Sequence, residues 1–155
     1  MSAKTPYDRM KELGIVLPPP PAPSANYVQY RIEDKFLFLA GHGPKLADGT
    51  YRTGRITGAE DVQQGYDDAK LTALNLLSTA DHALGDLGRV TGILRVFGMV
   101  NASPEFTMHP KVIDGCSELL VAVFGELARH PRCAVGMSSL PHGITVEVEA
   151  TFLVS

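Results

Sequence analysis

Two long stretches of helical periodicity, each flanked by runs typical of β-strands, constrain the fold of this chain more than any other feature. Apolar residues recur at three- and four-residue steps in segments 61–84 and 110–127. Strand-like runs precede the first helix, separate the two helices and follow the second. The expected strands are 27–32, 35–40, 90–100, 132–139 and 144–153. The order β-β-α-β-α-β-β predicts an α+β two-layer sandwich, in which two helices cover one mixed sheet.

The N-terminal part of the chain has a different character. Thr5 can cap a short helix over residues 5–13. Five prolines then fall within residues 18–23, where proline enforces an extended chain. We therefore divide the chain into an N-terminal helix and proline-rich linker, residues 1–23, and a main domain, residues 24–155.

Composition excludes several classes of function. The net charge is −3, and no cluster of basic residues is present to neutralise phosphates, so we expect no nucleic-acid partner. No apolar run reaches the length of a membrane span, and no signal-peptide pattern opens the chain. Two cysteines and five histidines show no metal-ligand spacing. We therefore expect a cytoplasmic protein with no membrane partner, no metal and no cofactor.

The last two predicted strands carry a candidate site. Paired as a hairpin around residues 140–143, they would place Cys133 opposite Ala150. Arg132 and Glu147 would then project from one face, about 13 Å apart along the ladder. An arginine can hold a carboxylate by two parallel hydrogen bonds, and a glutamate can activate a water molecule. The pattern thus favours a pocket for a small carboxylate.

Three alternatives stay open for this polar face. It could be an ordinary solvent-exposed face of an antiparallel sheet. Arg132 could instead pair diagonally with Glu149 as a structural ion pair. A β-bulge would shift the register on which the whole arrangement depends.

Histidine and cysteine residues give weaker signals. His42 follows a buried strand directly, so it is either a pocket residue or a loop histidine bonded to the backbone. Cys116 lies on the apolar stripe of the second helix, and Cys133 alternates with apolar residues of its strand. Both cysteines are expected to be buried hydrophobic residues rather than nucleophiles.

The C-terminal segment resembles the signature of the RidA/YjgF family, which keeps an arginine, a Leu-Pro turn and a Val-Glu-Val-Glu-type strand at fixed spacing. The matching segments are 131–135, 140–141 and 146–150, with weaker matches at 27–29, 38–42 and 75–77. The resemblance covers about residues 23 to 153, nearly the whole chain.

This resemblance implies a chorismate-mutase-like fold, in which three subunits pack their sheets into a central barrel and enclose pockets between neighbours. It implies a homotrimer that takes a small carboxylate or imine ligand. Active relatives hydrolyse reactive enamine/imine intermediates from amino-acid dehydratases to 2-keto acids and ammonia. By position, Arg132 corresponds to the carboxylate-binding arginine, Glu147 to the water-activating glutamate, Ala134 and Gly41 to backbone N–H donors, and Tyr27 to a tyrosine of the pocket wall.

Departures from the family pattern concern the pocket that sets substrate identity. The family's SGQ segment is Ala40-Gly41-His42 here, so a hydroxyl is lost and His42 replaces an amide. The family's helix asparagine is replaced by Asp114, and the cysteine two residues after the arginine by Ala134. The alternative is therefore a non-catalytic protein that binds or senses a small carboxylate or keto acid. Members of the family are also labelled endoribonucleases, but the net negative charge of this chain argues against an RNA substrate.

Overall fold

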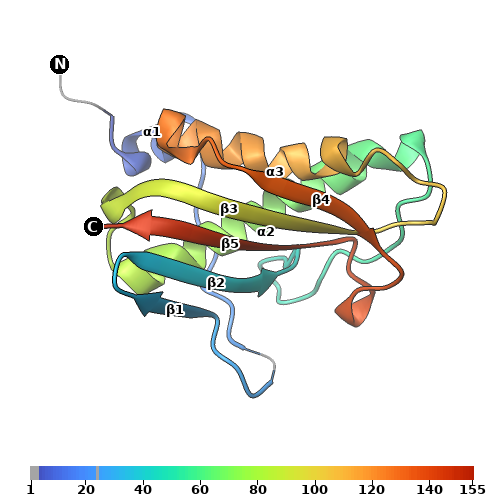
Figure 1. The fold of residues 1–155 in the computed structure, drawn as a ribbon, viewed down its shortest axis with the longest axis horizontal. Coiled ribbons are helices and arrows are strands. Elements are labelled where there is room, and N and C mark those ends of the chain that lie inside the picture. The colour runs from blue at the N-terminus through green and yellow to red at the C-terminus, as the bar shows by residue number, and fades with distance from the viewer. Residues whose placement is uncertain (1–3, 24) are drawn as a thin grey trace.

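The computed structural model describes residues 4–23 and 25–155 and shows two helices packed on one face of a five-stranded sheet (Figure 1). The helices are α1 (Pro6–Glu12), α2 (Val62–Leu84) and α3 (His109–Phe124). The strands are β1 (Tyr30–Glu33), β2 (Phe36–His42), β3 (Val90–Asn101), β4 (Arg132–Met137) and β5 (Val146–Val154). The predicted element order and the α+β two-layer architecture are confirmed.

The sheet has the order β1-β2-β5-β3-β4, so the last strand of the chain lies at its centre. All neighbours are antiparallel except β3 and β4, which are parallel. A parallel pair needs a crossover connection, and α3 supplies it between β3 and β4. The sheet is therefore mixed, as predicted.

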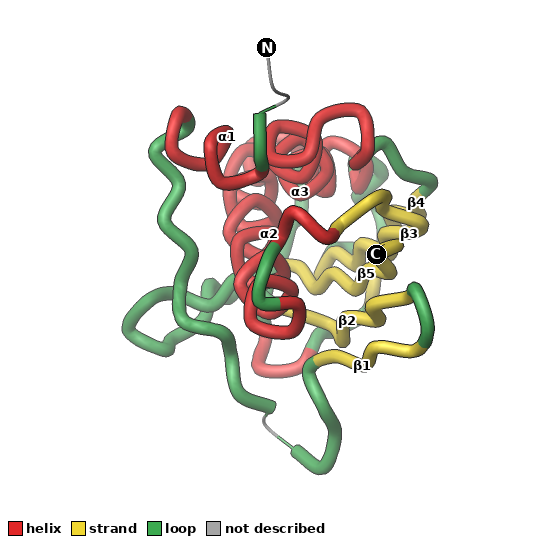
Figure 2. Tube along the Cα trace, turned by 90° about the vertical axis from the view of Figure 1, so that its left-hand side faces the viewer, coloured by secondary structure: helices red, strands yellow, loops and turns green. Residues whose placement is uncertain are grey.

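Helices α2 and α3 cover only one face of the sheet (Figure 2). Alternate residues of β5, including Val146, Val148 and Phe152, point to this side and are fully buried. None of the described helices lies over the opposite face, and Phe36 and Phe38 of β2 are exposed there, Phe38 by 46%. Strand β2, although apolar on both faces, is therefore covered on only one of them within a single chain.

The pairing predicted for the last two strands is also wrong. β4 does not pair with β5, because β3 lies between them. Phe97 of β3 is the partner of Cys133, while its neighbour Val96 is the partner of Ala150. The segment between β4 and β5 is consequently a connection that passes the end of β3 rather than a hairpin loop.

This topology reverses the predicted faces of β4. Arg132 pairs with the buried Val96 and points toward the helices, and Ala134 packs against the core on the same side. Cys133 points to the open face and is exposed, contrary to the prediction, whereas Cys116 is buried as predicted.

The N-terminal helix α1 forms as the sequence predicts. Thr5 accepts a hydrogen bond from the backbone of Asp8, whose carboxylate in turn accepts from the backbone of Thr5, a reciprocal capping box. The Tyr7 hydroxyl donates to Asp81 of α2 at 2.6 Å and accepts from the backbone N–H of Leu87 at 2.8 Å. Helix α1 is therefore fastened to the main domain by a specific polar contact. Within the described residues, no helix is long and apolar enough to cross a membrane.

Candidate functional site

Glu147 stands near the start of β5 and points to the open face of the sheet. It pairs with Met99 of β3, whereas its neighbours Val146 and Val148 are buried on the helix side. Burial of the half-buried side chain raises the pKa of Glu147, and the negative charge of Glu149 on the same face raises it further. A carboxyl group with a raised pKa can accept a proton and return it, as acid–base catalysis requires.

A hollow of about 370 Å³ opens beside the Glu147 carboxylate. Besides Glu147, it is lined by Tyr27, Ala40, Gly41, Gly43, Tyr51, Pro141, His142 and Ile144. Its volume lies within the range of sites for small organic ligands. The hollow thus brings together Glu147 with two other predicted site residues, Tyr27 and Gly41.

Gly41 leaves the space that the Glu147 side chain occupies. A Cβ atom at Gly41 would lie 3.0 Å from the carboxyl carbon of Glu147, closer than ordinary packing allows. The β2–β5 pairing is irregular here, since Leu39 pairs with Ala150 but the next paired residue of β2 is His42. A bulge of this kind commonly re-aims backbone next to a site.

Two aromatic residues of the hollow were missed by sequence reasoning. The rings of Tyr51 and His142 are stacked, with centroids 5.7 Å apart and planes within 3° of parallel. His142 has a positive φ of 59°, and its ring lies beside Tyr51 although the two residues are far apart in the chain. Both residues lie in irregular segments without periodicity, so only the fold brings them to the hollow.

His42 is held by bonds within the chain. The carbonyl of Ala40 accepts from Nδ1 at 2.6 Å, which leaves Nε2 to accept from the hydroxyl of Thr79 on α2 at 2.8 Å. The ring is buried, and this burial lowers the pKa of His42. The imidazole therefore ties the bulge of β2 to α2 in its neutral form, and it positions the Gly41 backbone.

Arg132 belongs to a second polar cluster, beneath α3. Its guanidinium donates to Asp114 at 2.7 Å, to the Ser117 hydroxyl at 2.9 Å and to the carbonyl of Pro110 at 3.1 Å. The Arg132 side chain is only 21% exposed. The structure thus joins two predicted site residues, Arg132 and Asp114, in one ion pair.

The two clusters lie on opposite faces of the sheet within one chain. Arg132 and Ala134 face the helices, whereas Glu147, Gly41 and Tyr27 border the open-face hollow. The predicted projection of Arg132 and Glu147 from one face is therefore wrong, because it assumed that β4 and β5 are neighbours. The predicted alternative pairing of Arg132 with Glu149 is replaced by the contact with Asp114.

Metal ligands are not gathered at either cluster. Across residues 4–23 and 25–155, no group of three or more histidine, cysteine or acidic side chains is arranged to hold a metal ion. The chemistry available at the hollow is that of a carboxyl group, tyrosine hydroxyls, the His142 imidazole and backbone N–H groups.

Comparisons with known proteins agree with this fold. The family model described as YjgF/chorismate mutase-like, putative endoribonuclease, matches residues 7–147. Protein TCP17 of Trypanosoma cruzi is 42% identical over 142 residues, which are 91% of this chain and 89% of TCP17.

Solved structures extend the comparison. A putative endoribonuclease from Shewanella oneidensis superposes with a TM-score of 0.91 at 32% identity, covering 97% of this chain and 100% of the other. A protein of unknown function from Agrobacterium tumefaciens, Atu1372, gives 0.87 at 36% identity, with 97% and 94% covered. The E. coli protein TdcF, solved with bound serine, shares the fold at 16% identity, with a TM-score of 0.64 and 88% and 94% covered. Together with the family match over most of its length, these likenesses show that the chain belongs to the YjgF/RidA family.

Proposed function

We propose that the chain hydrolyses small imines or enamines of amino-acid metabolism at the hollow that holds Glu147, releasing a carbonyl compound and ammonia. The observation that carries the proposal is the half-buried Glu147 carboxyl, whose pKa is raised, at the wall of a hollow of small-molecule size. Membership of the YjgF/RidA family supports the same reaction class.

In this reaction the Glu147 carboxylate accepts a proton from water, and the hydroxide attacks the imine carbon. As the C–O bond forms and the C=N bond becomes a single bond, Glu147 passes that proton to the nitrogen, which gives a neutral carbinolamine. Glu147 next takes the proton of the carbinolamine hydroxyl and passes it to the nitrogen, so the C–N bond breaks and ammonia leaves as the carbonyl forms. An enamine first tautomerises to the imine, taking a proton on carbon and losing one from nitrogen. Since Glu147 ends in its starting state, the sum is imine plus water to carbonyl plus ammonia.

A substrate that carries a carboxylate needs a cation, and within one chain Arg132 lies on the other face of the sheet. We therefore propose that the hollow is completed by Arg132 of a neighbouring subunit in a homotrimer. Two features support this assembly: β4, which begins with Arg132, is an edge strand, and the open sheet face exposes Phe36 and Phe38. Among the described residues, the bonds to α3 leave the Nε–H and one Nη1–H of Arg132 available.

A second candidate is a protein that binds a small carboxylate or keto acid without turning it over. The contact between Arg132 and Asp114 favours it, because a guanidinium already paired with a carboxylate attracts a second carboxylate less strongly. The acid–base group Glu147 would then serve only to line the hollow.

Ammonia release from imines that an amino-acid oxidase generates in situ tests the proposal. Purified chain should accelerate release above buffer, and Glu147→Gln should abolish the acceleration while the variant stays folded and keeps its trimeric mass. Full activity in Glu147→Gln contradicts the mechanism. Stabilisation by 2-keto acids without any turnover supports the binding protein instead, and light scattering that gives the mass of a monomer refutes the composite pocket.

A further inference from the structure

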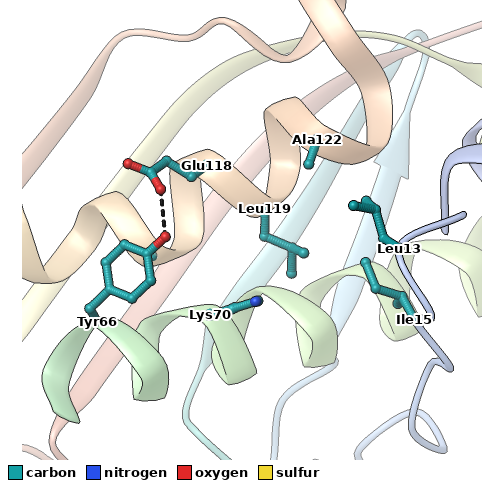
Figure 3. Close-up of a pocket in the computed structure, with 8 residues that line it drawn as sticks. Leu13, Ile15, Tyr66, Lys70, Glu118, Leu119 and Ala122 are labelled. Carbon is teal, nitrogen blue, oxygen red and sulfur yellow. Dashed lines mark hydrogen bonds between the residues drawn. The ribbon is translucent and has the colours of Figure 1, made fainter. Parts of the chain in front are cut away.

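A separate hollow lies between α2 and α3 on the side away from the sheet, where the segment after α1 crosses them (Figure 3). Its volume is about 270 Å³. Both the helix layer and the sheet stand between this hollow and the open-face hollow of Glu147. None of its lining residues takes part in the proposed reaction.

The floor of this interhelical hollow exists because Gly115 of α3 touches α2. A Cβ atom at Gly115 would lie 2.0 Å from the carbonyl oxygen of Tyr66, so any larger residue would push the helices apart. The close approach leaves Tyr66, Lys70 and Glu118 as walls on either side of the contact.

One end of the hollow is polar and carries both signs of charge. The Tyr66 hydroxyl donates a hydrogen bond to the Glu118 carboxylate, which holds that carboxylate at the Tyr66 end of the hollow (Figure 3). Lys70 lines the hollow one turn further along α2. Of the ion pairs among the described residues, none joins Lys70 to Glu118 or to another acidic side chain. The hollow thus offers one anion and one cation that do not neutralise each other.

The other end is aliphatic. Leu119 and Ala122 of α3 form one wall, and Leu13 and Ile15 from the turn after α1 form the other (Figure 3). Leu13 is 53% exposed, so an apolar ligand group bound against it would bury further apolar surface. The turn itself is held in place through Tyr7, whose hydroxyl bonds to α2.

From this arrangement we infer that the interhelical hollow is a binding site for an aliphatic α-amino acid such as leucine. The ammonium group pairs with Glu118, the carboxylate with Lys70, and the side chain lies on Leu13, Ile15 and Leu119. A simple carboxylic acid would leave Glu118 facing an anion, and a simple amine would leave Lys70 facing a cation. The small volume excludes nucleotide-sized ligands. The inference is independent of the reaction proposed at Glu147.

Titration of the ¹⁵N-labelled full chain with L-leucine, followed by amide chemical shifts, tests this site. Because Lys70 and Glu118 are both exposed, their ion pairs with the ligand are screened by water, and we expect a millimolar dissociation constant. The shifts should centre on Lys70, Gly115 and Ala122. Isocaproate, which lacks the ammonium group, and isoamylamine, which lacks the carboxylate, should each bind about threefold or more weakly.

Matched variants assign the contacts. Lys70→Gln and Glu118→Gln should each weaken leucine binding about threefold or more, and the glutamine oxygen can still accept from Tyr66. Lys111→Gln, elsewhere on α3, and Glu147→Gln should leave the binding unchanged. Isocaproate or isoamylamine binding as tightly as leucine, shifts that gather around Gly41, or no shift at high leucine concentration would each overturn the inference.

Discussion

Mixing two inactive variants gives the most direct test of a pocket built from two subunits. In one chain Arg132 faces α3 and Glu147 faces the open side of the sheet, so a pocket that uses both must take them from different copies. Arg132→Ala and Glu147→Gln should each abolish activity alone. Co-refolded in equal amounts, they should regain it.

The expected recovery follows from counting subunits. In the proposed assembly each pocket would receive its arginine from one copy and its glutamate from the neighbouring copy, and in an equal mixture each of these residues is intact half of the time. About a quarter of the pockets are therefore complete in a ring of heterologous contacts. Ammonia release per pocket should reach about a quarter of the wild-type rate.

A second mixture serves as the control. Wild-type chain refolded with an equal amount of the double variant should also show about a quarter of the wild-type rate if pockets are composite, but about half if each chain holds a complete site. No recovery in the first mixture together with half activity in the second would refute the two-subunit pocket. A sample of variants that are refolded separately and mixed afterwards corrects for activity that arises from slow exchange of subunits between trimers.

Four further substitutions probe the site and its supports. Gly41→Ala should lower kcat roughly tenfold or more with little change in melting temperature, because its methyl group displaces the Glu147 carboxyl group; unchanged kcat would show that the carboxylate position is unimportant. Asp114→Asn should lower KM for carboxylate-bearing substrates by freeing the charge of Arg132, with kcat unaffected, and a raised KM would instead mean that Asp114 orients the guanidinium. The folded-state pKa of Glu147 is raised, so the folded protein loses stability as the pH rises from the pKa of the unfolded chain through that of the folded one. Glu147→Gln cannot ionise, so it should raise the melting temperature at pH 8 but not below about pH 4, and calorimetry at both pH values checks this. His42→Ala should reduce the free energy of unfolding by about 2–4 kcal/mol in denaturant titrations, because the buried Thr79 hydroxyl and the half-buried Ala40 carbonyl lose their bonds to the ring, and a loss below about 1 kcal/mol would contradict that structural role.

Local pattern predicted the elements of this chain well. The helix expected over residues 61–84 begins at Val62 and ends at Leu84, because its apolar spacing and the glycine that follows are local signals. The capped helix after Thr5 could be predicted equally well from the sequence. Such signals act within a few residues, so they predict an element whichever tertiary structure the chain adopts.

Strand pairing and the faces of β4 could not be read in this way. Alternation shows which residues of a strand share a face, but it does not show which strand lies beside it. The apolar Cys133 and Val135 suggested a helix-facing side, yet the side that faces α3 carries Ala134 and Gly136. Small residues are needed there because α3 lies close, and a Cβ at Gly136 would fall 2.5 Å from the ring of His109. The small residues Ala134 and Gly136, at alternate positions of the strand, could have predicted that a helix packs closely on this side.

The central place of β5 has a consequence for how the protein is made. A ribosome releases residues 146–154 after every other strand, so a nascent chain holds β1–β2 and β3–β4 as two halves with no strand between them. The apolar surfaces of both halves remain exposed until residues 146–154 have been made, because only then can the long-range pairing with β5 begin. Chains cut short by even this one segment would expose two unpaired strand edges at once, a state in which chaperone binding and aggregation compete with completion of the sheet.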